Sequence, residues 1–228
     1  MIPAETERFW LDYIATERIR IRQESLCALD RFIDALLHLP PEVWHPWARQ
    51  LARRIVDEGE DIPVRTPLFR TVIFPALLAS MQNSVPGAAR WLAGFAQLLY
   101  KIPSCTDQLP QNRRSEFDLL QQAVQDDPND SLAKKRLLTL MRSRFDYVLH
   151  ELPAGVLYGH DGATIEECDE LLLELSDYER LAMELGGDNE DRELITESRF
   201  HIPAYRRYLS ERGRHTNYEA FLSTHERA

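Results

Sequence analysis

The adjacent residues His160 and Asp161 are the pair in this chain best placed for metal chemistry. An imidazole and a carboxylate that leave one short segment can bind a shared ion, provided that neighbouring helices supply further ligands. The loose candidates for those ligands are His38 and His201. The simpler interpretation is an Asp-Gly turn in a polar loop, since Gly162 follows directly. A metal-dependent hydrolase is therefore one hypothesis. Because the pair alone does not make a metal site, however, we expect no metal and no cofactor.

Other patterns that identify enzymes are missing from the sequence. The seven histidines show no i, i+4 pairing, and no cysteine lies at a zinc-like spacing to two histidines. The segment around Gly159 to Thr164 lacks the Lys-Ser/Thr of a phosphate-binding loop. We therefore expect no enzymatic activity. Tyr158, His160 and Asp161 remain candidates for contacts made by this loop, because loops on a rigid scaffold often carry binding residues.

Cysteine usage and hydropathy bear on the compartment. Cys27, Cys105 and Cys168 are odd in number and far apart, which is typical of reduced intracellular thiols. The first residues are acidic and include no hydrophobic segment, so we expect no signal peptide. No apolar run approaches the roughly 20 residues of a membrane span. We expect a cytoplasmic protein, by default of a bacterial cell, that binds no membrane.

Acidic residues are concentrated in one window of the chain. Thirteen of the 37 acidic residues lie between Thr164 and Glu197, where only Arg180 and Arg192 are basic. The window therefore carries a formal charge of −11, and everything outside it sums to +1. Localised charge can steer a basic partner, whereas diffuse charge mainly keeps a protein soluble. Like charges at i, i+4 spacing cost roughly a few tenths of a kcal/mol per pair. A sequence that accepts this cost favours a negative binding face, with a solvated outer helix as the alternative.

The candidate partner-binding residues are the acids beyond the first helical turn of this window. Glu166 and Glu167 are left aside, because acids in a first turn already stabilise the helix through its dipole. The candidates are Glu170, Glu174, Asp177, Glu184, Asp188, Glu190 and Asp191.

Basic residues gather in short clusters, one of which is Lys134, Lys135 and Arg136. Acidic residues lie near each cluster, and the sequence pI of about 5.2 differs from the strongly basic character of most nucleic-acid-binding domains. We interpret the clusters as solvated helix faces and expect no nucleic-acid partner.

Helical periodicity dominates the chain, and no segment keeps the alternation of a strand. Two helices or one bent helix are expected between Pro3 and Pro40. The next helix, from Pro41, carries Trp44 and Trp47 on its apolar face, where we expect both indoles to be core residues. Nine or ten helices with short connections predict an all-α fold, either a multi-helix bundle or a short α-solenoid.

The acidic residues fall on helices with clear start signals. Thr164 and Glu167 form a capping box. Beyond the first acidic helix we expect one helix over 188–199, a second over 203–212, and a short last helix capped by Thr216.

We expect one domain over residues 1–228, with a possible seam at 103–114, where two prolines and few apolar residues lie. The seam would separate an N-terminal part, 1–102, from a C-terminal part, 115–228, which holds the acidic helices of 164–197.

The segment LLQQAVQDDPND resembles a junction between tetratricopeptide repeats. Leu120, Ala123 and Pro128 have the spacing that closes such a repeat, and Leu137 follows where the next repeat places an apolar residue. The resemblance covers about residues 116–150, and no second copy is present. It implies a helical-repeat scaffold with a concave binding surface and no built-in chemistry.

These observations favour a non-enzymatic interaction protein that presents an acidic helical face to a basic protein partner. An immunity protein or antitoxin that occludes the basic cleft of a toxin is one form of this hypothesis. A tetratricopeptide-like peptide-binding scaffold or regulator is the alternative. The oligomeric state is left open.

Overall fold

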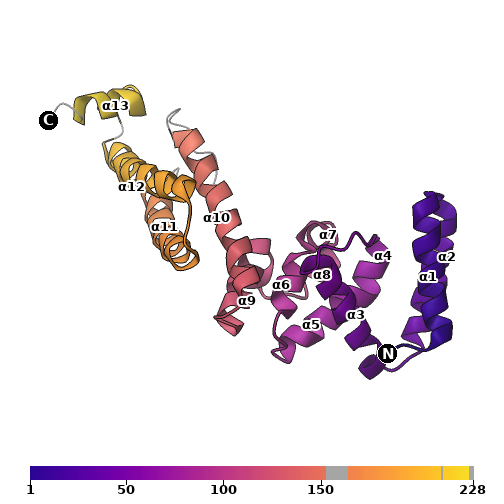
Figure 1. Ribbon diagram of the computed structural model, residues 1–228. Helices are drawn as coiled ribbons and strands as arrows, with labels where there is room; N and C mark the ends of the chain where they lie inside the picture. Colours follow the sequence, from indigo (N-terminus) through magenta and orange to yellow (C-terminus); the bar gives the residue numbers. More distant parts are fainter. Residues whose placement is uncertain (153–163, 212, 226–228) are drawn as a thin grey trace. The chain divides into compact units, whose positions relative to one another are not determined.

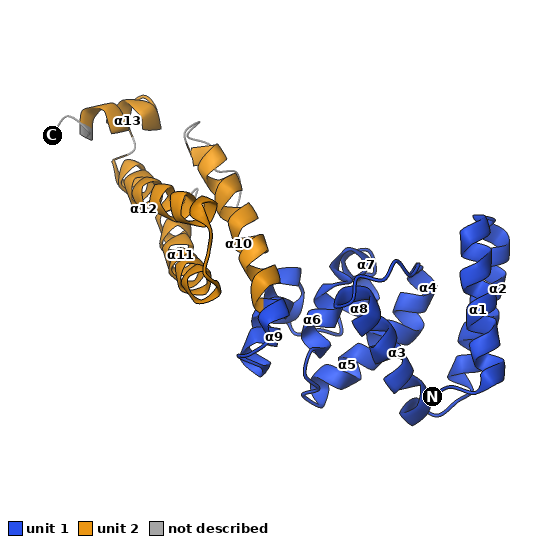
Figure 2. Cartoon of the chain, in the orientation of Figure 1, with its two compact units in different colours: residues 1–133 blue, residues 134–228 orange. Residues whose placement is uncertain are grey.

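The computed structural model describes residues 1–152, 164–211 and 213–225, and every regular element in these ranges is a helix (Figure 1). The predicted all-α class is therefore confirmed. The chain divides into two compact units, Met1–Ala133 and Lys134–Ala228 (Figure 2). None of the described helices is both long and apolar enough to cross a membrane.

Unit 1 begins with a hairpin of two helices, α1 (Ala4–Ile19) and α2 (Arg22–Leu37). Two helices therefore form here instead of one bent helix. The break lies at Arg20, whose φ of 62° is left-handed and ends α1. The hairpin is held to the next helix by aromatic packing, since the Trp10 ring lies 5.1 Å from the rings of both Phe32 and Trp47. The Tyr13 hydroxyl also donates a hydrogen bond of 2.9 Å to the carbonyl of Pro63.

Helix α3 (Pro41–Val56) begins at a proline, as expected, because a first-turn proline lacks only a donor that the helix does not need. Trp44 is buried, which confirms its assignment to the core, whereas Trp47 is only half-buried.

A continuous helical stretch follows, formed by α4 (Thr66–Leu68), a π-helical turn (Phe69–Ile73) and α5 (Phe74–Gln82). The wide π turn directly precedes Pro75, whose missing N–H cannot complete an ordinary α-helical ladder. The helix thus changes pitch before Pro75 and continues through it.

Four shorter helices complete the core of unit 1: α6 (Ala88–Ala93), α7 (Ala96–Tyr100), α8 (Pro103–Thr106) and α9 (Glu116–Asp126). Gly94 ends α6 against α3, where a Cβ atom would collide with the Val56 side chain. A buried ion network joins the remaining parts, because Arg90 donates to both carboxylate oxygens of Asp57 and pairs with Asp130. The indole N–H of Trp91 donates to the same Asp57 carboxylate.

The predicted seam at 103–114 is an ordered part of unit 1. It contains α8 and a 3-10 turn (Gln111–Arg113), and Cys105 and Leu109 along it are buried, as is Ile102 directly before it. These apolar side chains attach the segment to the core despite its prolines. The division between the two units instead falls inside α10 (Ser131–Glu151).

The resemblance to a tetratricopeptide junction, over residues 116–150, spans α9 and nearly all of α10. Leu120 and Ala123 are buried, and the Asp130 side chain accepts a hydrogen bond from the backbone N–H of Ala133, so this turn supplies a cap for α10. Helix α9 packs against α6. Tandem repeats remain a prediction.

Unit 2 contains α10 from Lys134 onward, α11 (Ile165–Leu185), α12 (Asn189–Ser210) and α13 (Tyr218–His225). The Phe145 and Tyr178 rings stack at 5.5 Å in its core and join α10 to α11. Tyr205 packs against Tyr218, and Tyr208 packs against Phe221, which attaches α13 to α12.

Two predictions about the last helices were wrong. The expected break before Pro203 does not occur, because α12 continues through it with Ile202 and Tyr205 buried on the same face as Ser198. Burial of that face outweighs the loss of one backbone hydrogen bond. The cap of α13 is supplied by Asn217, whose side chain accepts from the Ala220 N–H, and not by Thr216.

Candidate acidic interaction surface

Helices α11 and α12 both begin with capping boxes that use acidic residues. The Thr164 hydroxyl accepts from the Glu167 N–H while the Glu167 carboxylate accepts from the Thr164 N–H, as the sequence predicts. Asp188 and Asp191 make the same reciprocal pair at the start of α12. Part of the acidity in this window therefore satisfies backbone donors at helix ends.

An ionic cluster around the buried Asp191 joins α10 to the start of α12. Arg142 donates to both carboxylate oxygens of Asp191, at 2.9 and 2.8 Å, and to Asp188 and Glu190 at 3.0 and 3.1 Å. Asp191 is only 1% exposed and also accepts from the Tyr178 hydroxyl at 2.6 Å. Burial alone would raise the pKa of Asp191, but the hydrogen bonds from Arg142 and Tyr178 outweigh it and hold that pKa below its ordinary value. Asp191 thus stays charged inside the unit.

Other acids of the window pair with cations from outside it. On α10, Lys134 pairs with Glu184, and Arg144 donates to Glu174 at 2.7 Å. Two arginines in the second half of α12 pair with α11: Arg199 with Glu179 and Arg206 with Asp169. At least eight of the thirteen acids therefore have an ion pair within unit 2. The five cations from outside the window that make these pairs are Lys134, Arg142, Arg144, Arg199 and Arg206, so they offset five of its eleven net negative charges.

Lys134 contradicts the interpretation of its cluster as a solvated helix face. The whole residue is 8% exposed, and its ammonium group pairs with Glu184 of α11.

Two acids of α12 have no such role, and together with Glu190, which pairs with Arg142 yet stays exposed, they define a narrower surface. Glu193 and Glu197 are exposed on α12, and within the described parts of the chain neither has an ion-pair partner. Glu190 lies on the same side of α12, at i, i+3 and i+7 spacing with them, and 73% of its side chain is exposed. We call Glu190, Glu193 and Glu197 the acidic stripe.

The predicted contact residues fall into three groups. Glu170 is exposed, and no ion pair is found for it among the described residues. Asp177, Glu184, Asp188 and Glu190 are ion-paired, yet their side chains remain 53%, 45%, 58% and 73% exposed.

The third group comprises Glu174 and Asp191. Glu174 is half-buried against Arg144, and Asp191 is buried. A buried carboxylate cannot touch a partner without unfolding the cluster, so Asp191 is left out of the proposed surface. Glu193 and Glu197 are not among the residues predicted from the sequence, although their i, i+4 spacing, with no Lys or Arg three or four residues from either, is a usable signal.

The loop candidates Tyr158, His160 and Asp161 lie outside the described residues. Among the residues that are described, no group of three or more His, Cys, Asp or Glu side chains is arranged to hold a metal ion. The two further ligands considered above have other contacts: the His38 ring lies 2.6 Å from the Asp34 carbonyl, and the His201 ring lies 3.1 Å from the Tyr218 hydroxyl.

Comparison with protein-family models, with curated proteins and with solved structures finds no match to this chain. The functional argument therefore rests on the geometry of unit 2.

Proposed function

We propose that this chain is a non-enzymatic interaction protein that binds a basic protein partner through the acidic stripe of α12. The supporting observation is the contrast within one window of sequence. Most of its acids hold helices together, whereas Glu193 and Glu197 repel each other at i, i+4 spacing with no compensating cation among the described residues. A basic partner would supply that compensation.

The exposure of the stripe limits how much free energy its ion pairs with a partner can contribute to binding. Each ion pair formed at a solvent-exposed site contributes about 0.2–1 kcal/mol, so three pairs account for roughly 0.6–3 kcal/mol. Such charges act mainly on the rate of encounter and lose their effect in salt. Binding through this stripe should therefore be fast and sensitive to ionic strength.

A toxin with a basic active-site cleft is one partner that fits this chemistry, which would make the chain an immunity protein or antitoxin. An acidic helix placed over such a cleft would occlude it while gaining the ion pairs that the cleft normally makes with its substrate. The neighbouring reading frame is informative here, because a toxin or secretion gene beside this one would support the assignment.

The test replaces the three stripe carboxylates by amides, E190Q, E193Q and E197Q, which keeps their size and removes three charges. Partners are captured from the native cell extract at low salt, identified, purified, and their dissociation constants measured over a range of salt. The triple variant should bind about three- to a hundredfold more weakly and with a shallower salt dependence.

The matched control removes three exposed acids from α2 with the same change in net charge, E24Q, D30N and D34N. This control should bind the partner like the unmodified chain, since the charges lost lie in the other unit. Equal binding by the stripe variant would refute the proposal, and equal weakening by both variants would reduce it to an effect of net charge.

A further inference from the structure

We propose that two copies of this chain associate through antiparallel pairing of their α1 helices. The face concerned carries Glu7, Leu11, Ile14 and Arg18, at spacings of four, three and four residues. Side chains with this spacing form the seam of a coiled coil. The proposal concerns unit 1 and is independent of the function assigned to the acidic stripe.

The seam is open in the single chain. Leu11 is 60% exposed, Glu7 and Arg18 are exposed, and Ile14 is half-buried. Over the described residues, neither Glu7 nor Arg18 has an ion-pair partner. The buried residues of α1 lie on another face of the helix; they are Thr6, Trp10 and Tyr13. The rest of unit 1 therefore leaves two apolar and two charged side chains of one stripe available.

The order of these residues makes the seam complementary to itself. When two α1 helices run antiparallel with Glu7 opposite Arg18 of the second copy, Leu11 lies opposite Ile14, because both pairs share the same midpoint. A twofold axis through that midpoint gives two ion pairs and two apolar contacts, the isologous arrangement of most homodimers. Parallel pairing would instead place Glu7 against Glu7 and Arg18 against Arg18. The charges thus select the antiparallel orientation.

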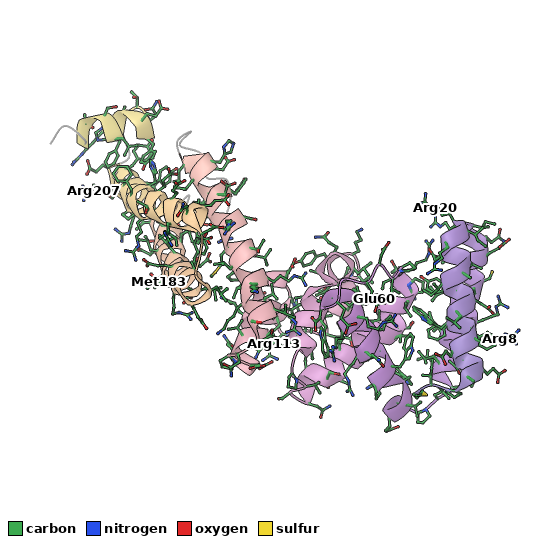
Figure 3. All side chains as sticks on the ribbon, viewed as in Figure 1. Arg8, Arg20, Glu60, Arg113, Met183 and Arg207 are labelled. Atoms are coloured by element: carbon green, nitrogen blue, oxygen red, sulfur yellow. The ribbon has the colours of Figure 1, made fainter. Side chains whose placement is uncertain are left out.

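The structure also leaves room beside the seam. A groove of about 870 Å³ in unit 1 has the seam along one side, and the half-buried Trp47, Arg54 and residues 60–63 on the other. Arg54 is already paired with Glu60, because two of its nitrogens donate to the two carboxylate oxygens of Glu60. Glu60 is labelled in Figure 3. The far side of the groove thus offers the apolar surfaces of Trp47, Ile62 and Pro63 together with the carboxylate of Asp61. Long side chains of a second α1 helix can be received there.

The size of the contact predicts a weak dimer. Helix α1 has 16 residues and is about 24 Å long at 1.5 Å per residue. A contact of this length is small beside the roughly 1,200–2,000 Å² buried in stable interfaces. We therefore expect a reversible, concentration-dependent equilibrium between monomer and dimer.

The experiment is analytical ultracentrifugation of the full chain from low to high micromolar concentration. The unmodified chain should shift from monomer to dimer and no further. The variants E7R and R18E each place like charges at both ends of the pair and should self-associate about tenfold more weakly or not at all. An equimolar mixture of E7R and R18E should form a heterodimer, because the two substituted side chains then face each other with opposite charges. At the other end of the same pair, the unmodified Glu7 of one copy meets the unmodified Arg18 of the other.

Matched controls make the same charge changes on other faces of α1, as E5R and R8E. Figure 3 shows Arg8 on the side of the hairpin that faces away from the rest of unit 1. These variants should dimerise like the unmodified chain, and mixing them should add nothing. The proposal is overturned if the unmodified chain stays monomeric, if E7R dimerises normally, or if the mixture fails to pair while circular dichroism shows intact helices. If the groove instead binds a helix of another protein, the purified chain should stay monomeric, which is the first of these results.

Discussion

Replacing Arg142 by methionine should strongly destabilise unit 2. The substitution removes four hydrogen bonds to three carboxylates but keeps much of the apolar stem. Asp191 would remain 1% exposed with only the Tyr178 hydroxyl and the Asp188 N–H as donors. Removing one partner of a buried ion pair costs about 3–5 kcal/mol. Because the Arg142 side chain is itself 30% exposed, solvent screening brings our expectation to about 2–3 kcal/mol.

The effect should depend on pH. In the unmodified chain the pKa of Asp191 is lowered, so its stabilisation is present above the ordinary value of 3.8 and is lost as the pH falls through the lower folded-state pKa. Without Arg142, burial is uncompensated and should raise that pKa above the ordinary value. The charged carboxylate is then a penalty that protonation relieves. The stability deficit of the variant should therefore be largest near neutral pH and shrink as the pH approaches 4.

The assay can separate the two units because all four tryptophans lie in unit 1. They are Trp10, Trp44, Trp47 and Trp91. Urea unfolding followed by far-ultraviolet circular dichroism should report the loss in unit 2, while the tryptophan fluorescence transition should not move.

The control R180M removes an arginine that is 69% exposed and makes one i, i+3 pair with Asp177, so its effect should stay within about 0.5 kcal/mol. The double variant R142M/D191N should recover much of the stability lost in R142M, since a neutral amide no longer needs a cation. The reasoning fails if R142M is as stable as R180M, or if the two changes of the double variant simply add.

Three further results are expected. The variant R90M should lower the stability of unit 1 by about 3 kcal/mol in tryptophan-monitored urea unfolding, because it leaves two carboxylates of a buried network without their cation. The control R53M, at an exposed site, should match the unmodified chain. A thiol reagent should label Cys27 quickly in the native protein and Cys168 only on unfolding, since burial raises the pKa of the Cys168 thiol to about 11; fast labelling of both would contradict its burial. The variant G186A should cost about 1 kcal/mol of stability, because φ is +71° there; an unchanged melting temperature would show that the backbone relaxes.

Local signals could be predicted from the sequence because they depend on residues within one helical turn. The capping box of Thr164, the cap at Asp130 and the termination of α11 at Gly186 all involve partners four or fewer residues away. The position of Pro203 shows the limit of such reasoning. Proline usually interrupts a helix, but burial of Ile202 and Tyr205 against the rest of unit 2 is a tertiary effect that no local pattern contains.

The charge window shows the same limit at the candidate site. Arg142 lies 49 residues before Asp191, and Lys134 lies 50 residues before Glu184, so their pairing requires knowledge of how α10 packs. A sequence count assigns every acid the same weight, whereas the fold divides them into caps, links between helices and a remainder. Only the remainder bears on a partner, because the other carboxylates already have a structural reason to be present.

The distinction also changes what an acidic composition implies for binding. A carboxylate that spans two helices is constrained by stability, so altering it confuses loss of binding with loss of folding. Glu193 and Glu197 escape this difficulty, since their neutralisation should leave the fold intact or slightly stabilise it by relieving like-charge repulsion. A variant that becomes more stable while binding its partner less well would separate the two roles. That combination is expected of Glu193 and Glu197 and of no carboxylate in the Arg142 cluster, to which Glu190 also belongs.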